Sequence, residues 1–221
     1  RTRIGDEAQV ATAGALEPAH RGAYAPASAL ASPMTRGARP RTQGPMTRPT
    51  AVVYIASSLD GFIARPDGGL DWLERVQLEG EDYGYRAHLD TIDTLVFGRA
   101  TFDVVMGFGG PWPYAGKRVV VLSRGPARAS VHDETYHSGS LSALLDHLGA
   151  EGAQRVYVDG GQAITSFLRE GLVDELTISV VPVVLGRGLR LFGELDEVPL
   201  ALVDSRSYPS GLVQLRYRVA R

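Results

Sequence analysis

The stretch Arg155-Val156-Tyr157-Val158-Asp159-Gly160-Gly161-Gln162-Ala163 decides the fold class, because an apolar, β-branched run passes through two glycines directly into a helical pattern. That helical pattern covers 163–170, and Gly171 follows it as a C-cap. A strand that feeds a helix through a glycine turn is the repeating unit of open α/β sheets. In such sheets ligands bind just past the carboxyl ends of the strands, so this turn is a candidate binding segment.

Two further segments follow predicted strands in the same way. Gly98-Arg99-Ala100-Thr101 follows the strand 94–97, and Ser123-Arg124 follows the strand 117–122. Glycine lets a backbone approach a phosphate, and a helix start offers free N–H groups to the anion. The arginines and hydroxyls add charge-assisted hydrogen bonds, and Ser123 with Arg124 could hold a monophosphate. Taken singly, each segment is also compatible with an ordinary turn and a solvated arginine.

The rest of the chain continues the alternation of strands and helices. We predict strands at 51–56 and 175–184, a short apolar segment at 62–64, a weakly patterned helix over 78–89, a helix from Thr101 to before Pro111, a helix over 141–148 with Ser140 as N-cap, and a hairpin of 200–207 with 212–219. The sequence therefore predicts an α/β fold whose sheet is mixed and mainly parallel, flanked by helices, with a C-terminal antiparallel hairpin.

The composition divides the chain into two parts. Residues 1–49 are rich in Ala, Arg, Pro, Gly and Thr and lack apolar periodicity, so we expect a disordered N-terminal tail. Residues 50–221 have the patterning of one folded domain. The numbering starts at Arg1 rather than at a methionine, and we expect Met46 to be the natural start.

Several classes of function are excluded by what the sequence lacks. The chain has no cysteine, which excludes disulfides and thiolate zinc sites and fits the cytoplasm. It has no apolar run of about 18 residues, so we expect no membrane span. Its five histidines include no His-x-x-x-His pair, so we expect no metal. The net charge is +4 over 1–49 and −6 over the rest, which argues against nucleic acid as a partner of the folded part.

The order and spacing of the three segments, after the opening Tyr54-Ile55-Ala56-Ser57-Ser58-Leu59-Asp60-Gly61-Phe62-Ile63-Ala64, resemble the dihydrofolate-reductase-like family. From about Thr50 to Arg221 the chain is most similar to the branch that includes the reductase domain (RibD C-terminal domain) of the bifunctional riboflavin-biosynthesis enzyme. The resemblance implies NADPH bound across the strand ends and hydride transfer to a C=N or C=O group of a flat heterocycle or an opened sugar. The zinc signature of a nucleobase deaminase is missing, which excludes the fused, bifunctional form.

Carried over position by position, the resemblance implies a set of cofactor-binding residues. The diphosphate and adenosine phosphate region would be held by Gly98, Arg99 and Thr101, the 2′-phosphate by Ser123 and Arg124, the other side of the diphosphate by Gly160, Gly161, Gln162 and Ala163, and the nicotinamide would be flanked by Ala56 and Ile63. Residues 65–71 match a mobile loop that closes over the nicotinamide, with Trp72 at its end.

At the substrate end, the resemblance offers two carboxylates as catalytic candidates. Asp82 stands 16 positions before Gly98, where dihydrofolate reductases have a pterin-binding acid, and Asp60 lies in a turn similar to that of the riboflavin-type reductases. Either could assist proton delivery, because hydride transfer itself needs mainly positioning of donor and acceptor. A solvated helix face for Asp82 and a structural turn for Asp60 are the alternatives.

Four functions remain compatible with the sequence, one of which, dihydrofolate reductase proper, fits the residues less well than the other three. The first is an NADPH-dependent reductase of a small pterin- or pyrimidine-like heterocycle. The second is a riboflavin-pathway reductase of a phosphorylated ribosylaminopyrimidine, in which Arg187 and Arg190 could meet the substrate phosphate. The third is a non-catalytic NADPH-binding module. A homodimer through the last strand or through 182–191 is the expected assembly.

Overall fold

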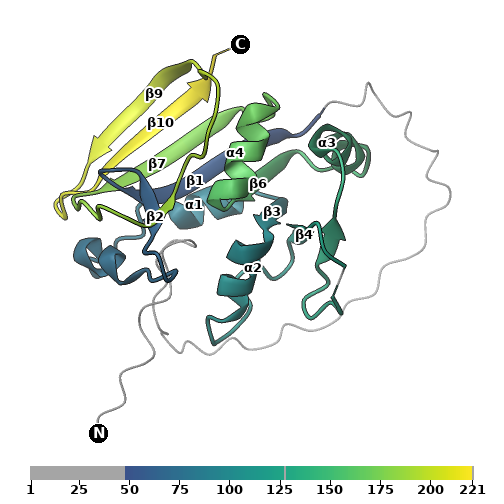
Figure 1. The fold of residues 1–221 in the computed structure, drawn as a ribbon, viewed down its shortest axis with the longest axis horizontal. Coiled ribbons are helices and arrows are strands. Elements are labelled where there is room, and N and C mark those ends of the chain that lie inside the picture. The colour runs from purple at the N-terminus through teal and green to yellow at the C-terminus, as the bar shows by residue number, and fades with distance from the viewer. Residues whose placement is uncertain (1–47, 127, 221) are drawn as a thin grey trace, which may run out of the picture.

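The computed structural model describes residues 48–126 and 128–220. Its main sheet has the strand order β5-β4-β3-β6-β1-β7-β10-β9 (Figure 1). The strands are β1 (Thr50–Ser58), β3 (Thr94–Gly98), β4 (Arg118–Leu122), β5 (Thr135–His137), β6 (Arg155–Asp159), β7 (Glu175–Val181), β9 (Leu200–Ser207) and β10 (Val213–Val219). All pairings from β5 to β7 are parallel, and only β10 pairs antiparallel, with β7 and with β9. The predicted mixed, mainly parallel α/β sheet with a C-terminal hairpin is confirmed.

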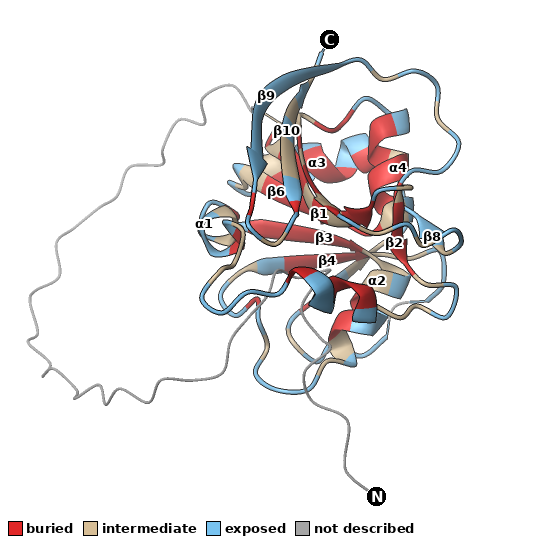
Figure 2. Cartoon of the chain, turned by 90° about the vertical axis from the view of Figure 1, so that its left-hand side faces the viewer, coloured by how far each residue is buried: buried red, intermediate tan, exposed pale blue. Residues whose placement is uncertain are grey.

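Helices cover both faces of this sheet, as Figure 2 shows in a view along its edge. The helices are α1 (Tyr85–Asp90), α2 (Arg99–Met106), α3 (Leu141–Ala150) and α4 (Gly161–Arg169), with a 3-10 helix η1 (Asp71–Val76) beside β7. One core lies between α3, α4 and the sheet, with Leu145, Ile164 and Phe167 fully buried. A second core lies between α1, α2 and the opposite face, around Phe97 and Phe102.

Sequence patterning explains both the strands and the longer helices. Along β1, Val53 and Ile55 point to the α3–α4 side whereas Val52 points to the α1–α2 side, so a β-branched run is buried on both faces. On α3, the four leucines at 141, 144, 145 and 148 are all buried, as their helical spacing predicts. The Ser140 side chain accepts a hydrogen bond from the Ala143 N–H and caps the helix as expected.

Two aspartates fix the amino-terminal edge of the parallel strands. The Asp93 carboxylate accepts hydrogen bonds from the Gln154 and Arg155 N–H groups, at 2.7 and 2.9 Å, and so joins the start of β3 to the start of β6. Asp174 accepts from the Ala51 N–H at 2.8 Å and from Arg48. These contacts satisfy backbone donors at one edge of the sheet, so the opposite edge, where the strands end, is the one open to a ligand.

The structure differs from the sequence-based expectations in four places. The helix predicted over 78–89 is wrong in its first half: only α1 is helical, because Gly80, Tyr83 and Gly84 all have positive φ. The short β5, η1 and β8 (Leu189–Arg190) were not predicted. Strand β7 ends at Val181 rather than at residue 184. Arg48, assigned to the tail, is bonded to Leu172 O and Asp174. The expectations for residues 1–47, including Met46 as the start, lie outside the described residues.

A second, two-stranded sheet pairs β2 (Phe62–Ala64) with β8 antiparallel. At Gly188, φ is +156° and a Cβ would lie 2.1 Å from the Ala64 carbonyl oxygen, so the backbone can approach β2 this closely only at a glycine. The segment 185–191 therefore forms a strap that is held against β2. No helix in the described part of the chain is long and apolar enough to cross a bilayer.

We predict that Asp93→Ala destabilises the domain by about 2 kcal/mol, because it removes charge-assisted hydrogen bonds to two backbone N–H groups. Urea unfolding should show this loss as a lower midpoint. Asp90→Ala is the matched control, since the Asp90 side chain is exposed and has no hydrogen bond or ion pair among the described residues. Equal midpoints for the two variants would contradict a role of Asp93 in joining β3 to β6.

Candidate functional site

The loops that follow β3 and β6 touch each other at the carboxyl edge of the sheet. Gly160 has φ +103°, and a Cβ there would lie 2.3 Å from the Thr101 hydroxyl oxygen. A Cβ on Gly98 would lie 3.7 Å from the Cβ of Ala163. The starts of α2 and α4 therefore lie side by side, with the free N–H groups of their first turns at the same edge. This brings together Gly98, Thr101, Gly160 and Ala163, as the sequence predicted.

The loop after β4 joins this group through Arg99. The guanidinium Nη1 of Arg99 donates a hydrogen bond to Ser123 Oγ at 3.2 Å, and its carbon lies 5.3 Å from the ring centroid of Tyr136. The neighbouring Arg124 is exposed and forms no ion pair within the described residues. One held guanidinium and one hydroxyl thus lie together, and Arg124 directly follows that hydroxyl in the chain, which gives a donor set for a phosphate.

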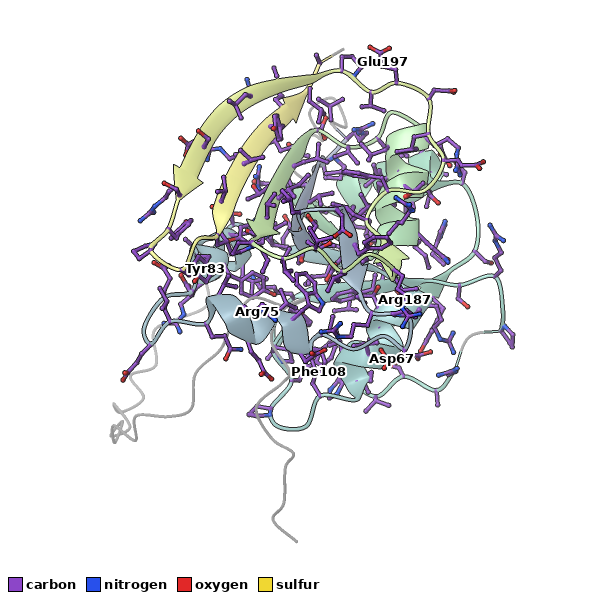
Figure 3. The ribbon with its side chains drawn as sticks, turned by 60° about the vertical axis from the view of Figure 1, so that its left-hand side comes forward. Asp67, Arg75, Tyr83, Phe108, Arg187 and Glu197 are labelled. Atoms are coloured by element: carbon purple, nitrogen blue, oxygen red, sulfur yellow. The ribbon has the colours of Figure 1, made fainter. Side chains whose placement is uncertain are left out.

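The strap and β2 complete the edge on the side of α4. A Cβ on Gly161 would lie 2.7 Å from the Arg190 carbonyl oxygen and 3.1 Å from Ile63 Cδ1, so Ile63 and the strap pack directly on the first turn of α4. Figure 3 shows Asp67 and Arg187, from the loops beside β2 and β8, on the same side of the molecule. Gln162 is exposed on the same helical turn.

Ala56, an expected neighbour of the nicotinamide, lies near the carboxyl end of β1, and its surroundings follow from the pairing of the strands. It pairs with Ser179 on β7, which pairs in turn with Gln214 on β10. Paired residues point to the same face, so Ala56 has two polar neighbours that sequence reasoning missed. Gln214 Nε2 donates to Ser179 Oγ at 3.1 Å and to the Tyr54 hydroxyl at 2.9 Å. Their spacing along three different strands gave no local signal.

Tyr83 closes this polar row from the side of α1. Its carbonyl oxygen accepts from the Tyr54 hydroxyl at 2.6 Å and from Gln214 Nε2 at 3.1 Å, and its φ is +56°. Its own hydroxyl donates to the Val76 carbonyl and lies 2.9 Å from Ser210 Oγ. An unfavourable backbone conformation held by this many contacts is typical of a functional region.

Asp60 is held as an anion by three donors. Ser58 Oγ lies 2.6 Å from Asp60 Oδ1, the Leu185 N–H donates to the same oxygen at 3.0 Å, and the Gly186 N–H donates to Oδ2 at 2.7 Å. The Ser58 hydroxyl and the backbone donors lower the pKa of Asp60 to about 2, against a partial opposing effect of desolvation. Asp60 is therefore ionised at neutral pH and ties the strap to the turn after β1.

Asp82 is engaged at the start of α1. Its Oδ1 accepts from the Gly84 N–H at 2.9 Å and its Oδ2 from the Arg86 N–H at 3.0 Å. Both bonds satisfy backbone donors that a helix start leaves open. The carboxylate thus has a structural explanation that does not need a substrate.

Asp159, which the sequence analysis placed only as part of a turn, is the fully buried acid of the site. It ends β6 directly before Gly160, and within the described residues neither of its oxygens has a hydrogen bond of good geometry. Burial raises the pKa of Asp159 to about 7, and the Gly160 N–H and the Tyr157 hydroxyl offset only part of this rise. The signal in the sequence was an acid directly after the apolar run Val156-Tyr157-Val158.

Taken together, the edge offers what an extended phosphate-bearing ligand requires. Two helix starts and two glycine turns provide backbone N–H groups, and Arg99, Ser123 and Arg124 provide charged and hydroxyl donors at one end. Ile63, which is buried, packs on the first turn of α4, and the half-buried Ala56 lies beside Ser179. The donor set fits a dinucleotide with an additional phosphate.

The family model of the RibD C-terminal domain matches residues 49–214. The uncharacterized protein YwjB of Bacillus subtilis is 37% identical over 168 residues, which are 75% of this chain and 95% of YwjB. A crystal structure of a candidate riboflavin biosynthesis protein from Shewanella sp. PV-4 is similar, with a TM-score of 0.74 and 37% identity, covering 78% of this chain and 99% of that one. A Thermotoga maritima diaminohydroxyphosphoribosylaminopyrimidine deaminase/5-amino-6-(5-phosphoribosylamino)uracil reductase shares the fold at 15% identity and a TM-score of 0.61, over 78% of this chain and 57% of that one.

We predict that Asp159 makes stability depend on pH. Its folded pKa of about 7 lies above the ordinary value of 3.8, so its contribution is fully present below pH 3.8 and is lost as the pH rises through about 7. Asp159→Asn should remove this loss, which is at most about 4 kcal/mol for such a shift. Thermal melts from pH 4 to 9 should show a flatter profile for Asp159→Asn than for Asp196→Asn, whose aspartate is exposed. Parallel profiles for the two variants would exclude a buried, protonated Asp159.

Proposed function

Because this chain belongs to the RibD C-terminal domain family, we propose that it is a reductase that transfers hydride from NADPH to a small heterocyclic, pterin- or pyrimidine-like substrate. Reductases of this family use NADPH. The observation that carries the proposal is the hydrogen bond between Arg99 and Ser123, because it joins two loops into one phosphate site beside the exposed Arg124. NADPH supplies the hydride when it is bound.

Different residues at the carboxyl edge of the sheet would bind different parts of the cofactor. Gly98, Arg99 and Thr101 and, from the other side, Gly160, Gly161, Gln162 and Ala163 would hold the diphosphate region, and Ser123 and Arg124 would hold the 2′-phosphate. The contact of Thr101 with Gly160 keeps the two helix starts at a fixed separation, which pre-organises their N–H groups for the anion. Ala56 and Ile63 would flank the nicotinamide and exclude water from it.

Hydride transfer is completed by delivery of a proton. The two carboxylates expected to deliver it, Asp60 and Asp82, both accept hydrogen bonds from backbone N–H groups. Asp60 keeps a pKa of about 2 and is bound by three donors, so we assign it the positioning of the strap rather than proton donation. Asp82 bonds the start of α1. For a substrate whose nitrogen or oxygen must gain a proton, water near the polar row of Ser179 and Gln214 is the donor we propose.

A riboflavin-pathway reductase of a phosphorylated ribosylaminopyrimidine is the second candidate. The observation in its favour is the position of Arg187 and Arg190, which are exposed on the strap that packs on Gly161, next to the proposed cofactor site. Turnover of that substrate with NADPH would favour this candidate. Binding of NADPH without its oxidation by any pterin or aminopyrimidine offered would instead favour a non-catalytic NADPH-binding module.

We predict that Arg124→Ala weakens NADPH binding about tenfold and changes NADH binding less than twofold, because the two cofactors differ only in the 2′-phosphate. Titration of the full chain by quenching of tryptophan fluorescence measures both constants. Arg218→Ala removes the same charge from an exposed arginine at the opposite edge of the sheet and should change neither. Equal losses for NADPH and NADH in Arg124→Ala would contradict the phosphate role.

We further propose that the hairpin of β9 and β10 forms a homodimer. Strand β9 is exposed along its whole length, as the pale blue ribbon of Figure 2 shows, and among the described residues it pairs with β10 alone. Leu200, Leu202 and Val213 on one face of the hairpin are 40%, 59% and 38% exposed. An unpaired edge beside an apolar face is a surface that a second copy can extend and cover.

We predict that Leu202→Asp gives a monomer where the unaltered chain gives a dimer, because a charge cannot be buried in such an interface without a partner. Light scattering coupled to size exclusion measures the mass. Leu78→Asp, at a leucine that is 43% exposed elsewhere, should leave the dimer intact. A monomeric unaltered chain at high concentration would refute the dimer.

A further inference from the structure

The carboxylate of Asp103 joins two guanidiniums at the phosphate end of the site. Its Oδ1 lies 3.0 Å from Arg128 Nη1, and its Oδ2 lies 3.4 Å from Arg99 Nε. Asp103 stands on α2, one turn after Arg99, whereas Arg128 comes from the loop that follows β4. One acid thus links the start of a helix to a loop that is separate from it in the sequence.

The same loop is tied to α2 at two points. Its beginning is held by the hydrogen bond from Arg99 to Ser123, and Arg128 is held by Asp103. Arg124 lies between these two ties and is exposed. The loop therefore folds back on α2 in a way that gathers three arginines at the end of β4, a clustering that the spacing of Arg124 and Arg128 alone does not reveal.

The two arginines that Asp103 holds differ in accessibility. The side chain of Arg99 is 22% exposed, since it also packs on Tyr136, whereas the side chain of Arg128 is 63% exposed. Arg99 is thus held in place by its neighbours, whereas Arg128 has guanidinium N–H groups that a ligand could still reach. A guanidinium has five N–H donors, and the bond to Asp103 uses one nitrogen of Arg128.

The charge of this cluster suits a phosphate monoester. The three guanidiniums against Asp103 have a net charge of +2. The carboxylate of Glu134, which lies 3.4 Å from the hydroxyl of the Tyr136 ring on which Arg99 packs, lowers this net charge to +1. A phosphate monoester has a charge of about −1.5 to −2 at pH 7 and several acceptor oxygens. Arginine binds such a group in a bidentate manner that lysine cannot reproduce.

We propose that Arg128 is a third guanidinium of the adenosine 2′-phosphate subsite, and that Asp103 is the positioning residue that holds Arg128 and Arg99 toward it. This inference rests on the proposed function, because it needs NADPH to be the ligand of the edge. It adds two residues to which no sequence pattern assigned a role, and it makes the preference for NADPH over NADH depend on an ion-pair network rather than on Ser123 and Arg124 alone.

The alternative is a surface ion pair without function. Exposed pairs of this kind contribute little to stability, so the melting temperature should respond weakly to loss of Arg128 in either case. Ligand binding is therefore the readout that separates the two explanations. The probe is adenosine 2′,5′-bisphosphate, with adenosine 5′-monophosphate as the ligand that lacks only the 2′-phosphate.

In calorimetric titrations of the full chain, Arg128→Gln should bind the bisphosphate about tenfold more weakly, as expected for the loss of a charge-assisted hydrogen bond. Its affinity for the monophosphate should stay within twofold of the unaltered chain. Arg118→Gln is the matched control, because Arg118 forms a similar exposed ion pair, with Glu151, at the other end of the same strand β4. It should change neither affinity.

Asp103→Asn tests the positioning role of Asp103, because the two explanations predict opposite changes in the affinity for the bisphosphate. Removing an acid beside an anion site strengthens anion binding if the acid only competes with the ligand. If Asp103 holds the two guanidiniums in place, the same change weakens bisphosphate binding several-fold. Weaker binding supports the proposal, and tighter or unchanged binding overturns the role of Asp103.

Failure of this inference and failure of the proposed function give different results. Suppose that the unaltered chain binds the bisphosphate more tightly than the monophosphate, and that the bisphosphate affinity of Arg128→Gln is within twofold of the unaltered chain's. Arg128 is then not part of the subsite, but the proposal that NADPH is the cofactor stands. If the unaltered chain binds the bisphosphate no better than the monophosphate, both proposals fail.

Discussion

Strand β3 lies between β4 and β6, and the three strands run parallel, so the loops that leave them must share one edge of the sheet. Two of these loops meet where Thr101 faces Gly160, because a side chain on Gly160 would overlap the threonine hydroxyl. This steric constraint sets the separation of α2 from α4. The positions of the backbone donors, of Arg99 and of the strap on Gly161 all follow from that separation.

The aspartates of this domain perform different tasks according to their surroundings. Asp93 and Asp174 accept backbone N–H groups at the amino-terminal edge, and Asp60 does so for the strap. In each case the carboxylate satisfies backbone donors that would otherwise be unpaired. Asp159 is the exception, since burial raises its pKa to about 7 next to the glycine turn. An acid that is unfavourable where it stands, at the edge that we assign to the cofactor, is typical of a site selected for function rather than for stability.

Sequence patterns predicted the parts of the fold that depend on local information. Buried strands such as β3 and β6 are β-branched runs, and α3 has leucines at helical spacing with a serine cap. The helix over 78–89 was wrong because the turns at Gly80 and Gly84 outweighed three apolar positions. Strands β5 and β8 have two or three residues and exist only through pairing with distant segments.

For the candidate site, the same distinction between local and long-range information applies. The glycine turns, Arg99 and Ser123 were visible as strand-to-helix segments, and the structure places them in contact. Ser179, Gln214 and Arg128 were missed because their partners come from other strands or loops. The burial of Asp159 was missed because it depends on how the turn after β6 packs against the rest of the domain. Asp60 and Asp82 were identified by position, but only their hydrogen bonds show that backbone groups already use both carboxylates.

The most direct test of the account is a crystal structure of this chain with NADP⁺ bound. We predict one dinucleotide whose diphosphate lies between the starts of α2 and α4, with its adenosine 2′-phosphate against Ser123 and Arg124 and its nicotinamide beside Ala56 and Ile63. A dinucleotide bound elsewhere, or one that leaves the Gly160–Gly161 turn and Arg99 without contact, would contradict the central claim that these three loops form a single cofactor site.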